Sequence, residues 1–130
     1  MYNYFMLVGY VASNLELKVL GDGRKVCNML LRVRRDFKDM NGEYIYDLIR
    51  VTMWEFLAEM ACETLKKGSR VGLKGRITPK TETLENGYQT IVHTLTADRI
   101  IYFDERSKDE DEEESLSNLD DDNTLEANEE

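Results

Sequence analysis

The chain has 130 residues and a net charge of −9, and the charge is divided very unevenly between two segments. Residues 1–104 carry 15 Lys and Arg against 13 Asp and Glu, whereas residues 105–130 carry 2 against 13 and no aromatic residue. We therefore expect one domain over residues 1–104 and a disordered acidic tail over residues 105–130, because the tail cannot bury enough apolar surface to fold. The apolar runs are too short to span a membrane and no secretory signal precedes them, so we expect a cytoplasmic protein without a membrane partner.

Five segments have the apolar residues and flanking turns of β-strands. They span residues 4–11, 25–34, 44–54, 70–80 and 89–101. Residues that tolerate a positive φ precede the last four: Gly21-Asp22-Gly23, Asn41-Gly42, Gly68 and Asn86-Gly87. Pro79, the only proline, is expected to end the fourth strand, and residues 79–88 are expected to form a loop.

One segment between the third and fourth strands has helical spacing. Its apolar residues recur at intervals of three and four: Leu57, Met60, Ala61 and Leu65. Lys66, Lys67 and Gly68 then provide a C-terminal charge and a stop signal. Three strands, one helix and two strands predict an all-β protein, a five-stranded Greek-key barrel of the oligonucleotide-binding (OB) fold. An unrelated small α+β sheet is the alternative that the pattern alone leaves open.

Alternation along three predicted strands separates an apolar face from a face rich in cations and aromatic rings. The apolar faces, expected to form the core, hold Cys27, Met29, Leu31 and Val33; Ile45, Ile49, Val51 and Met53; and Val71, Leu73, Gly75 and Ile77. The opposite faces hold Arg32 and Arg34, with Arg35 and Phe37 just beyond; Tyr44, Tyr46, Leu48, Arg50, Thr52 and Trp54; and Lys74, Arg76, Thr78 and Lys80. Agreement among three strands favours a binding surface over an ordinary solvated sheet.

This outer surface has the composition of a single-strand binding site. Aromatic rings stack on unpaired bases, and Lys and Arg neutralise the phosphates between them, with little sequence preference. Duplex DNA hides the faces of its bases, so exposed rings favour single strands. The pattern alone also leaves RNA, oligosaccharides and proteins open as ligands, because this fold hosts several functions.

The sequence holds no constellation of catalytic residues. His93 is the only histidine, and Cys27 and Cys62 belong to no CxxC or Cys/His cluster. A phosphate-binding loop of the GxxxxGK[ST] kind and a metal-ligand spacing are both missing. We therefore expect a non-enzymatic protein that uses no cofactor and no metal, with both cysteines reduced.

Several motifs between residues 3 and 104 are distinctive when they are taken together. They are Asn3, Phe5-Met6-Leu7-Val8-Gly9, Leu15-Glu16-Leu17-Lys18, the Gly-rich turn before Val26, Gly42-Glu43, Ile49-Arg50-Val51-Thr52-Met53-Trp54, Leu57-Ala58-Glu59, and Leu65-Lys66-Lys67-Gly68-Ser69 with Gly75-Arg76. In this combination the chain resembles the bacterial single-stranded-DNA-binding protein family. The resemblance implies non-specific binding of single-stranded DNA in replication, recombination and repair, by a homotetramer, with a dimer as the smaller alternative.

The resemblance also implies which residues contact DNA. Phe37 and Trp54 match two base-stacking positions of the family, whereas Leu48 and Glu82 stand where an aromatic residue is usual. Each lost ring is expected to weaken binding by about 1–3 kcal/mol, which keeps open an alternative function, an OB-fold protein-interaction or primosomal module with weak or no DNA binding. The full candidate set is Phe37, Tyr44, Tyr46, Trp54, Tyr88, Arg32, Arg34, Arg35, Arg50, Lys74, Arg76 and Lys80.

The acidic tail departs from the family pattern at its tip. The family usually finishes in an apolar Pro-Phe terminus that docks on DNA-processing enzymes, but here Asp120-Asp121-Asp122 is followed by Glu129-Glu130 without a terminal phenylalanine. Recruitment of DNA-processing proteins through the tail is therefore left open. Both departures, in the rings and in the tail, fit a divergent copy such as one from a phage or mobile element.

Overall fold

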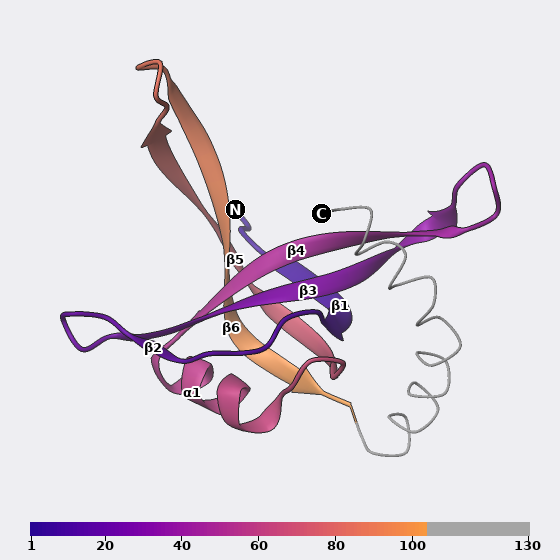
Figure 1. Cartoon of the computed structure of the whole chain (residues 1–130), viewed down its shortest axis with the longest axis horizontal. Helices are drawn as coiled ribbons and strands as arrows, with labels where there is room; N and C mark the ends of the chain where they lie inside the picture. The colour runs from indigo at the N-terminus through magenta and orange to yellow at the C-terminus, as the bar shows by residue number, and fades with distance from the viewer. Residues whose placement is uncertain (104–130) are drawn as a thin grey trace.

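A computed structural model describes residues 1–103 of the chain (Figure 1). Its elements, in chain order, are β1 (Phe5–Val11), β2 (Lys18–Val19), β3 (Lys25–Lys38), β4 (Tyr44–Trp54), α1 (Glu55–Thr64), β5 (Arg70–Thr83) and β6 (Gln89–Tyr102). The five predicted strands and the predicted helix are all present, and the two-residue β2 is an addition to them. The acidic tail predicted over residues 105–130 lies outside the described residues.

The strands form one sheet that closes on itself as a barrel. Their order is β1-β5-β6-β4-β3-β2, and β1 also pairs with β3, for example at Tyr10 and Arg32. β4 and β6 run parallel, with Thr52 beside Thr96, whereas the other neighbours are antiparallel. With α1 between β4 and β5 in the sequence, this topology confirms the predicted five-stranded Greek-key OB barrel, and β2 only adds a short pairing at the start of β3.

The core lies inside the barrel, and α1 covers one end of it against β3, β4 and β6 (Figure 1). Many of the residues that strand alternation predicts to face inward have fully buried side chains: Cys27, Met29, Leu31, Val51, Met53, Val71 and Leu73. The predicted core residues Val33, Ile45, Ile49 and Ile77 are only half-buried. Ala58 and Ala61 of α1 are also fully buried, and their small side chains let the helix backbone approach the strands. Burial of this apolar surface is the main force that holds the barrel together.

Two hairpins extend from the barrel as arms, one formed by β3 and β4 and the other by β5 and β6 (Figure 1). Both arms are longer than predicted, because β3 ends at Lys38 and β5 ends at Thr83. The prediction that Pro79 ends its strand was wrong. Pro79 lies opposite His93 of β6, and within residues 1–103 no strand pairs with the other edge of β5 at that point. A strand edge of this kind tolerates the missing N–H of proline.

Asn3 fixes the point at which the β5–β6 arm leaves the barrel. The ladder between β1 and β5 ends at the pair formed by Phe5 and Gly75. Two residues further along, the side-chain amide of Asn3 donates to the Ile77 carbonyl at 2.7 Å and accepts from the Ile77 N–H at 2.8 Å. The amide group therefore takes the place of one more backbone pair at the base of the arm.

Gly75 allows β5 to pass very close to β6 and β1. A Cβ atom at this position would lie 1.9 Å from the carbonyl oxygen of Thr96 and 2.8 Å from the ring of Phe5. The close approach coincides with a register shift, because Lys74 pairs with Arg99 whereas Gly75 pairs with Ala97. The extra residue in β6 is therefore Asp98, and the resulting bulge bends the strand as the barrel closes.

We expect Gly75→Ala to destabilise the barrel by about 1–3 kcal/mol or more, because the added methyl group meets backbone atoms that cannot move aside cheaply. Gly21→Ala is the matched control, since a Cβ there would have no atom within 4 Å. Urea unfolding followed by circular dichroism measures both. Equal unfolding midpoints for the two variants would contradict this account of Gly75.

Candidate nucleic-acid interface

A row of polar side chains crosses the outer face of the barrel. The strand register places Asn28 of β3 beside Thr52 of β4, and the Thr52 hydroxyl donates to Asn28 Oδ1 at 2.8 Å. The register also places Thr96 of β6 between Thr52 and Arg76 of β5. The outer faces of β3, β4, β6 and β5 therefore follow one another in register, although Thr52 in the middle of this row is only 8% exposed. The sequence pattern predicted these faces only strand by strand.

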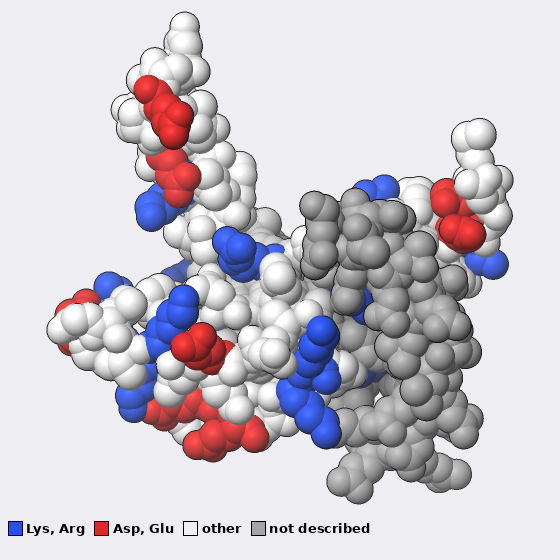
Figure 2. Space-filling model, in the orientation of Figure 1, with Lys and Arg blue, Asp and Glu red and all other residues white. Residues whose placement is uncertain are grey.

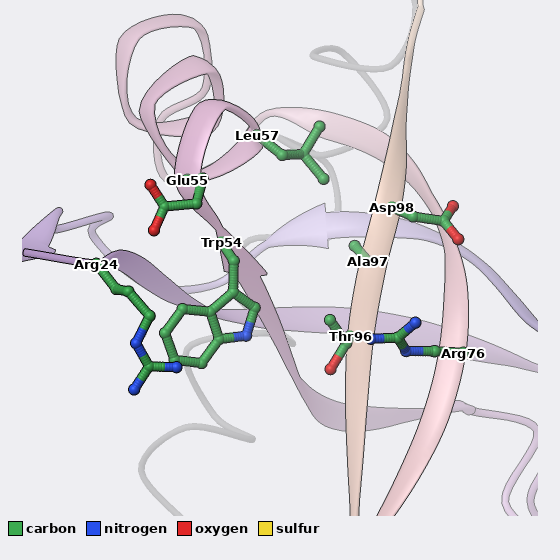
Figure 3. A pocket seen from close by; sticks show the side chains of 8 residues that line it. All are labelled: Arg24, Trp54, Glu55, Leu57, Arg76, Thr96, Ala97 and Asp98. Carbon is green, nitrogen blue, oxygen red and sulfur yellow. The ribbon is translucent and has the colours of Figure 1, made fainter.

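Trp54, at the end of β4, lines a hollow of about 530 Å³ on this surface (Figure 3). The lining residues are Arg24, Trp54, Glu55, Leu57, Arg76, Thr96, Ala97 and Asp98. In Figure 3 the edge of the indole that carries its nitrogen points toward Thr96 and Arg76. The half-buried ring and the Arg76 guanidinium thus line the same hollow, and a ring and a cation are the two groups that a stacked base and its phosphate require.

Arg24, which the sequence analysis did not select, lies over the Trp54 ring. Its guanidinium carbon is 5.0 Å from the ring centroid, within the cation–π range. Its Nε also donates to Asp22 Oδ2 at 2.7 Å. The backbone N–H of Arg24 and then its guanidinium hold the pKa of Asp22 below the usual value. Strand register is the signal that finds this residue, because Val26 pairs with Trp54 and a side chain two residues before Val26 is directed to the same face.

Tyr44 and its cations form a second cluster, on the β3–β4 arm. The guanidinium carbon of Arg34 lies 4.3 Å from the centroid of the Tyr44 ring, and Lys38 Nζ lies 4.8 Å from it. Phe37 belongs to the same stretch of β3, and 61% of its surface is exposed. The structure therefore brings two predicted rings and one predicted arginine onto one arm.

Arg35 is engaged differently from the other predicted cations. Its Nε and one terminal nitrogen donate to the two oxygens of Asp47 at 2.9 and 2.8 Å. Asp47 lies opposite Val33 in the ladder, and Val33 belongs to the core-facing set. The hydrogen bond to Arg35 lowers the pKa of Asp47, and Asp47 raises the pKa of Arg35. The candidate charge at Arg35 is therefore paired within the protein.

The β5–β6 arm holds the next group of candidates. Arg76 is exposed at its base and lines the Trp54 hollow. Lys80 is exposed further along β5, and Tyr88, with 72% of its surface exposed, lies in the loop after Gly87. Glu82, for which the resemblance implies an aromatic residue, places an exposed carboxylate on the same arm.

The remaining candidates lie on the outer face but have different surroundings. Arg50 is exposed, whereas Arg32 and Tyr46 are half-buried and each is engaged by another group. Lys74 is directed toward the start of the chain, where its ammonium lies 5.3 Å from the centroid of the Tyr4 ring. The predicted set is therefore spread over the outer surface: Trp54 and Arg76 line one hollow, whereas Arg34, Phe37 and Tyr44 lie on the β3–β4 arm.

Positive and negative side chains are mostly found on different parts of the surface. In the view of Figure 2, most Lys and Arg side chains lie over the barrel and near the bases of the arms, whereas Asp and Glu lie mainly on the arms and over α1, with some acidic atoms also among the cations of the barrel. A chain of phosphates is attracted to the cations of the barrel and repelled by the acidic arm tips. The electrostatics therefore favour a path across the barrel surface.

Other chemistry is sparse in residues 1–103. No group of three or more His, Cys, Asp and Glu side chains is placed to hold a metal ion in this part of the chain. Cys27 and Cys62 are free thiols, and burial together with the neighbouring Cys62 raises the pKa of Cys27 to about 12. Cys27 therefore stays protonated, and a protonated thiol is a poor nucleophile. Among the described residues, none belongs to a helix that is both long and apolar enough to cross a bilayer.

Comparisons with known proteins give a consistent result. The family model described as the single-strand binding protein family matches residues 2–103. Single-stranded DNA-binding protein B of Bacillus subtilis is 32% identical over 109 residues, which cover 84% of this chain and 96% of that protein. Single-stranded DNA-binding proteins of Streptococcus pneumoniae and Streptococcus mutans are 34% and 30% identical, over 82% and 90% of this chain and 69% and 71% of theirs.

We expect Trp54→Ala to weaken binding of a labelled oligonucleotide more than Tyr88→Ala does. Trp54 lies in a hollow with a guanidinium beside it, whereas Tyr88 lies in the loop at the end of an arm. The loss at Trp54 should reach about 1–3 kcal/mol. Fluorescence polarisation measures the affinities, and unfolding curves check that both variants fold. A larger loss at Tyr88 would mean that the arm, and not the barrel surface, is the main stacking platform.

Proposed function

The chain belongs to the single-strand binding protein family, and on this premise we propose that residues 1–104 bind single-stranded DNA with little sequence preference. The binding protects exposed strands during DNA replication, recombination and repair. The observation that carries the proposal is the Trp54 hollow, which an aromatic ring and the Arg76 guanidinium line from two sides of Thr96 (Figure 3). Binding alone performs this task, so the proposal includes no catalytic step.

The mechanism combines stacking with neutralisation of phosphates. Trp54 and Phe37 take stacked bases, and the surrounding cations release counterions from the phosphates, which makes the affinity fall as salt rises. Duplex DNA gains only the second of these terms, because its bases are already stacked on each other. The proposed contacts are Phe37, Tyr44, Tyr46, Trp54, Tyr88, Arg32, Arg34, Arg35, Arg50, Lys74, Arg76 and Lys80, with Arg35 the weakest because Asp47 already pairs with it.

The two positions without rings lower the expected strength of binding. Leu48 of β4 lies opposite Arg32 of β3 and is 40% exposed, and Glu82 is an exposed carboxylate. Leu48 offers apolar contact without a π-face, and Glu82 repels phosphate. We therefore expect weaker binding, or a shorter footprint on DNA, than four stacking rings would give. Each missing ring should weaken the binding free energy by about 1–3 kcal/mol.

We also propose that the protein assembles as a homotetramer, with a dimer as the smaller alternative, and acts in the cytoplasm. The outer face of β1 supports assembly. Tyr4, Met6 and Val8 follow one another on alternate positions at the start of the chain, and 57%, 41% and 37% of their surfaces are exposed. An apolar strip of this kind on a small barrel is typical of an interface between subunits.

We expect oligo-dT to quench the emission of Trp54, the only tryptophan, whereas a duplex of equal length leaves the emission nearly unchanged. The physical reason is that only an unpaired base can stack on the indole. The titration is run at two salt concentrations, with a competition assay between the two forms of DNA. No quenching by oligo-dT would favour the protein-interaction module, and equal affinity for duplex would contradict the stacking mechanism.

We further propose that the acidic segment 105–130 competes with DNA for the cations of the outer surface. Opposite charges attract the segment to the domain, and this attraction is screened over about 10 Å at 0.1 M salt. Removing residues 105–130 should therefore tighten oligo-dT binding at low salt and change it little at high salt. Affinities of the full chain and of residues 1–104 are compared across a salt series, after unfolding curves show that the truncated chain folds. Superimposed curves at the lowest salt would exclude competition and leave solubility or a protein partner as the role of the segment.

A further inference from the structure

Arg24 has a fixed backbone and a weakly held side chain. Its carbonyl accepts from the Leu20 N–H at 2.8 Å, and Gly23, with a φ of 90°, closes the turn through a 2.9 Å hydrogen bond to Leu20. The side chain is held only at the surface, where 59% of it is exposed beside Asp22 and the Trp54 ring. The turn therefore sets the position from which the guanidinium moves.

The guanidinium and a stacked base need the same space over Trp54. Stacked rings keep their centroids about 4.5–7 Å apart, and the Arg24 carbon lies 5.0 Å from the indole centroid. An exposed ion pair and an exposed cation–π contact each favour the covered state by no more than about fivefold. Stacking of one base is worth about 5- to 150-fold, and the displaced cation gains a phosphate in addition. Together the ion pair and the cation–π contact favour the covered state by at most about 25-fold. Over most of its range, stacking combined with the new phosphate contact outweighs this, so we expect a base to displace Arg24.

We propose that Arg24 is a movable cation, which covers Trp54 in the free protein and moves onto a DNA phosphate when a base stacks on the indole. Arg24 and Arg76 lie on opposite sides of the indole in Figure 3, so the displaced guanidinium leaves one cation on each side of the stacked base. Asp22 competes with the phosphate for Arg24 through their 2.7 Å contact. The proposal rests on the single-stranded DNA binding proposed above.

The salt dependence of oligo-dT binding by the full chain tests the phosphate contact. Arg24→Gln should weaken binding about threefold to tenfold at low salt and lower the slope of log affinity against log salt by about 0.7, the value for one phosphate contact on a single strand. Arg24→Lys keeps the charge and should keep the slope. Asp22→Asn should tighten binding about twofold to fivefold at low salt, because it removes the competing carboxylate. Lys67→Gln, beyond the end of α1, removes the same charge from another place and is the matched control.

The cover over Trp54 is tested without DNA. Acrylamide, a neutral quencher, should reach Trp54 more readily in Arg24→Gln than in the parent chain or in Lys67→Gln, because the guanidinium no longer shields one face of the ring. Equal quenching in all three proteins would overturn the covered state.

The outcomes separate this proposal from the proposed function. If the parent chain binds oligo-dT and Arg24→Gln keeps its slope and affinity, the movable cation is wrong and single-strand binding stands. Weaker binding by Asp22→Asn would also contradict the proposal that Arg24 leaves Asp22 for a DNA phosphate. If the parent chain does not bind oligo-dT at all, both the proposed function and the movable cation fail.

Discussion

The parallel pairing of β4 with β6 is the constraint on which the rest of the structure depends. It joins two antiparallel hairpins that are otherwise separate in the sequence, through the neighbours Val51–Leu95 and Thr52–Thr96. The first pair belongs to the inner layer, whereas the second belongs to the row of side chains on the outer surface. The contact that joins the two hairpins therefore also brings Trp54 of one hairpin and Arg76 of the other to the same hollow. The pairing of β4 with β6 therefore contributes to both the core and the outer surface.

Because the same strands form both the core and the outer surface, the composition of that surface depends on few residues. Each strand of the barrel supplies core side chains at every second position, so the outer surface has only the intervening positions available. Since Leu48 and Glu82 are not aromatic, Trp54 and Phe37 are the rings that we propose for most of the stacking. The hollow beside Trp54 holds four charged side chains, namely Arg24, Glu55, Arg76 and Asp98. The proposed exchange at Arg24 would therefore take place among charges of both signs.

The succession of strands and helix along the chain and the inward-facing core residues could be predicted from the sequence, because both follow from periodicity. The buried side chains of Met29, Val51 and Leu73 are examples. Features that depend on pairing between distant segments could not. Alternation does not reveal that β5 has a free edge at Pro79, that Asp98 is an extra residue in β6, or that Asp47 pairs with Arg35. Arg24 was missed for the same reason, since only the register of β3 against β4 brings it to Trp54. The proposed roles of the site residues stay predictions.

The hydrogen bonds of Asn3 have a practical consequence for how the protein is handled. They tie the third residue of the chain to Ile77, 74 positions later, at the base of the arm that carries Lys80 and Tyr88. An affinity tag or fluorescent fusion placed ahead of Met1 sits two residues from this junction and can pull on it. Immobilisation through such a tag therefore places the attachment close to the arm that is being assayed. The outer face of α1, for instance at exposed Glu63, is a better point of attachment, because it lies at the covered end of the barrel.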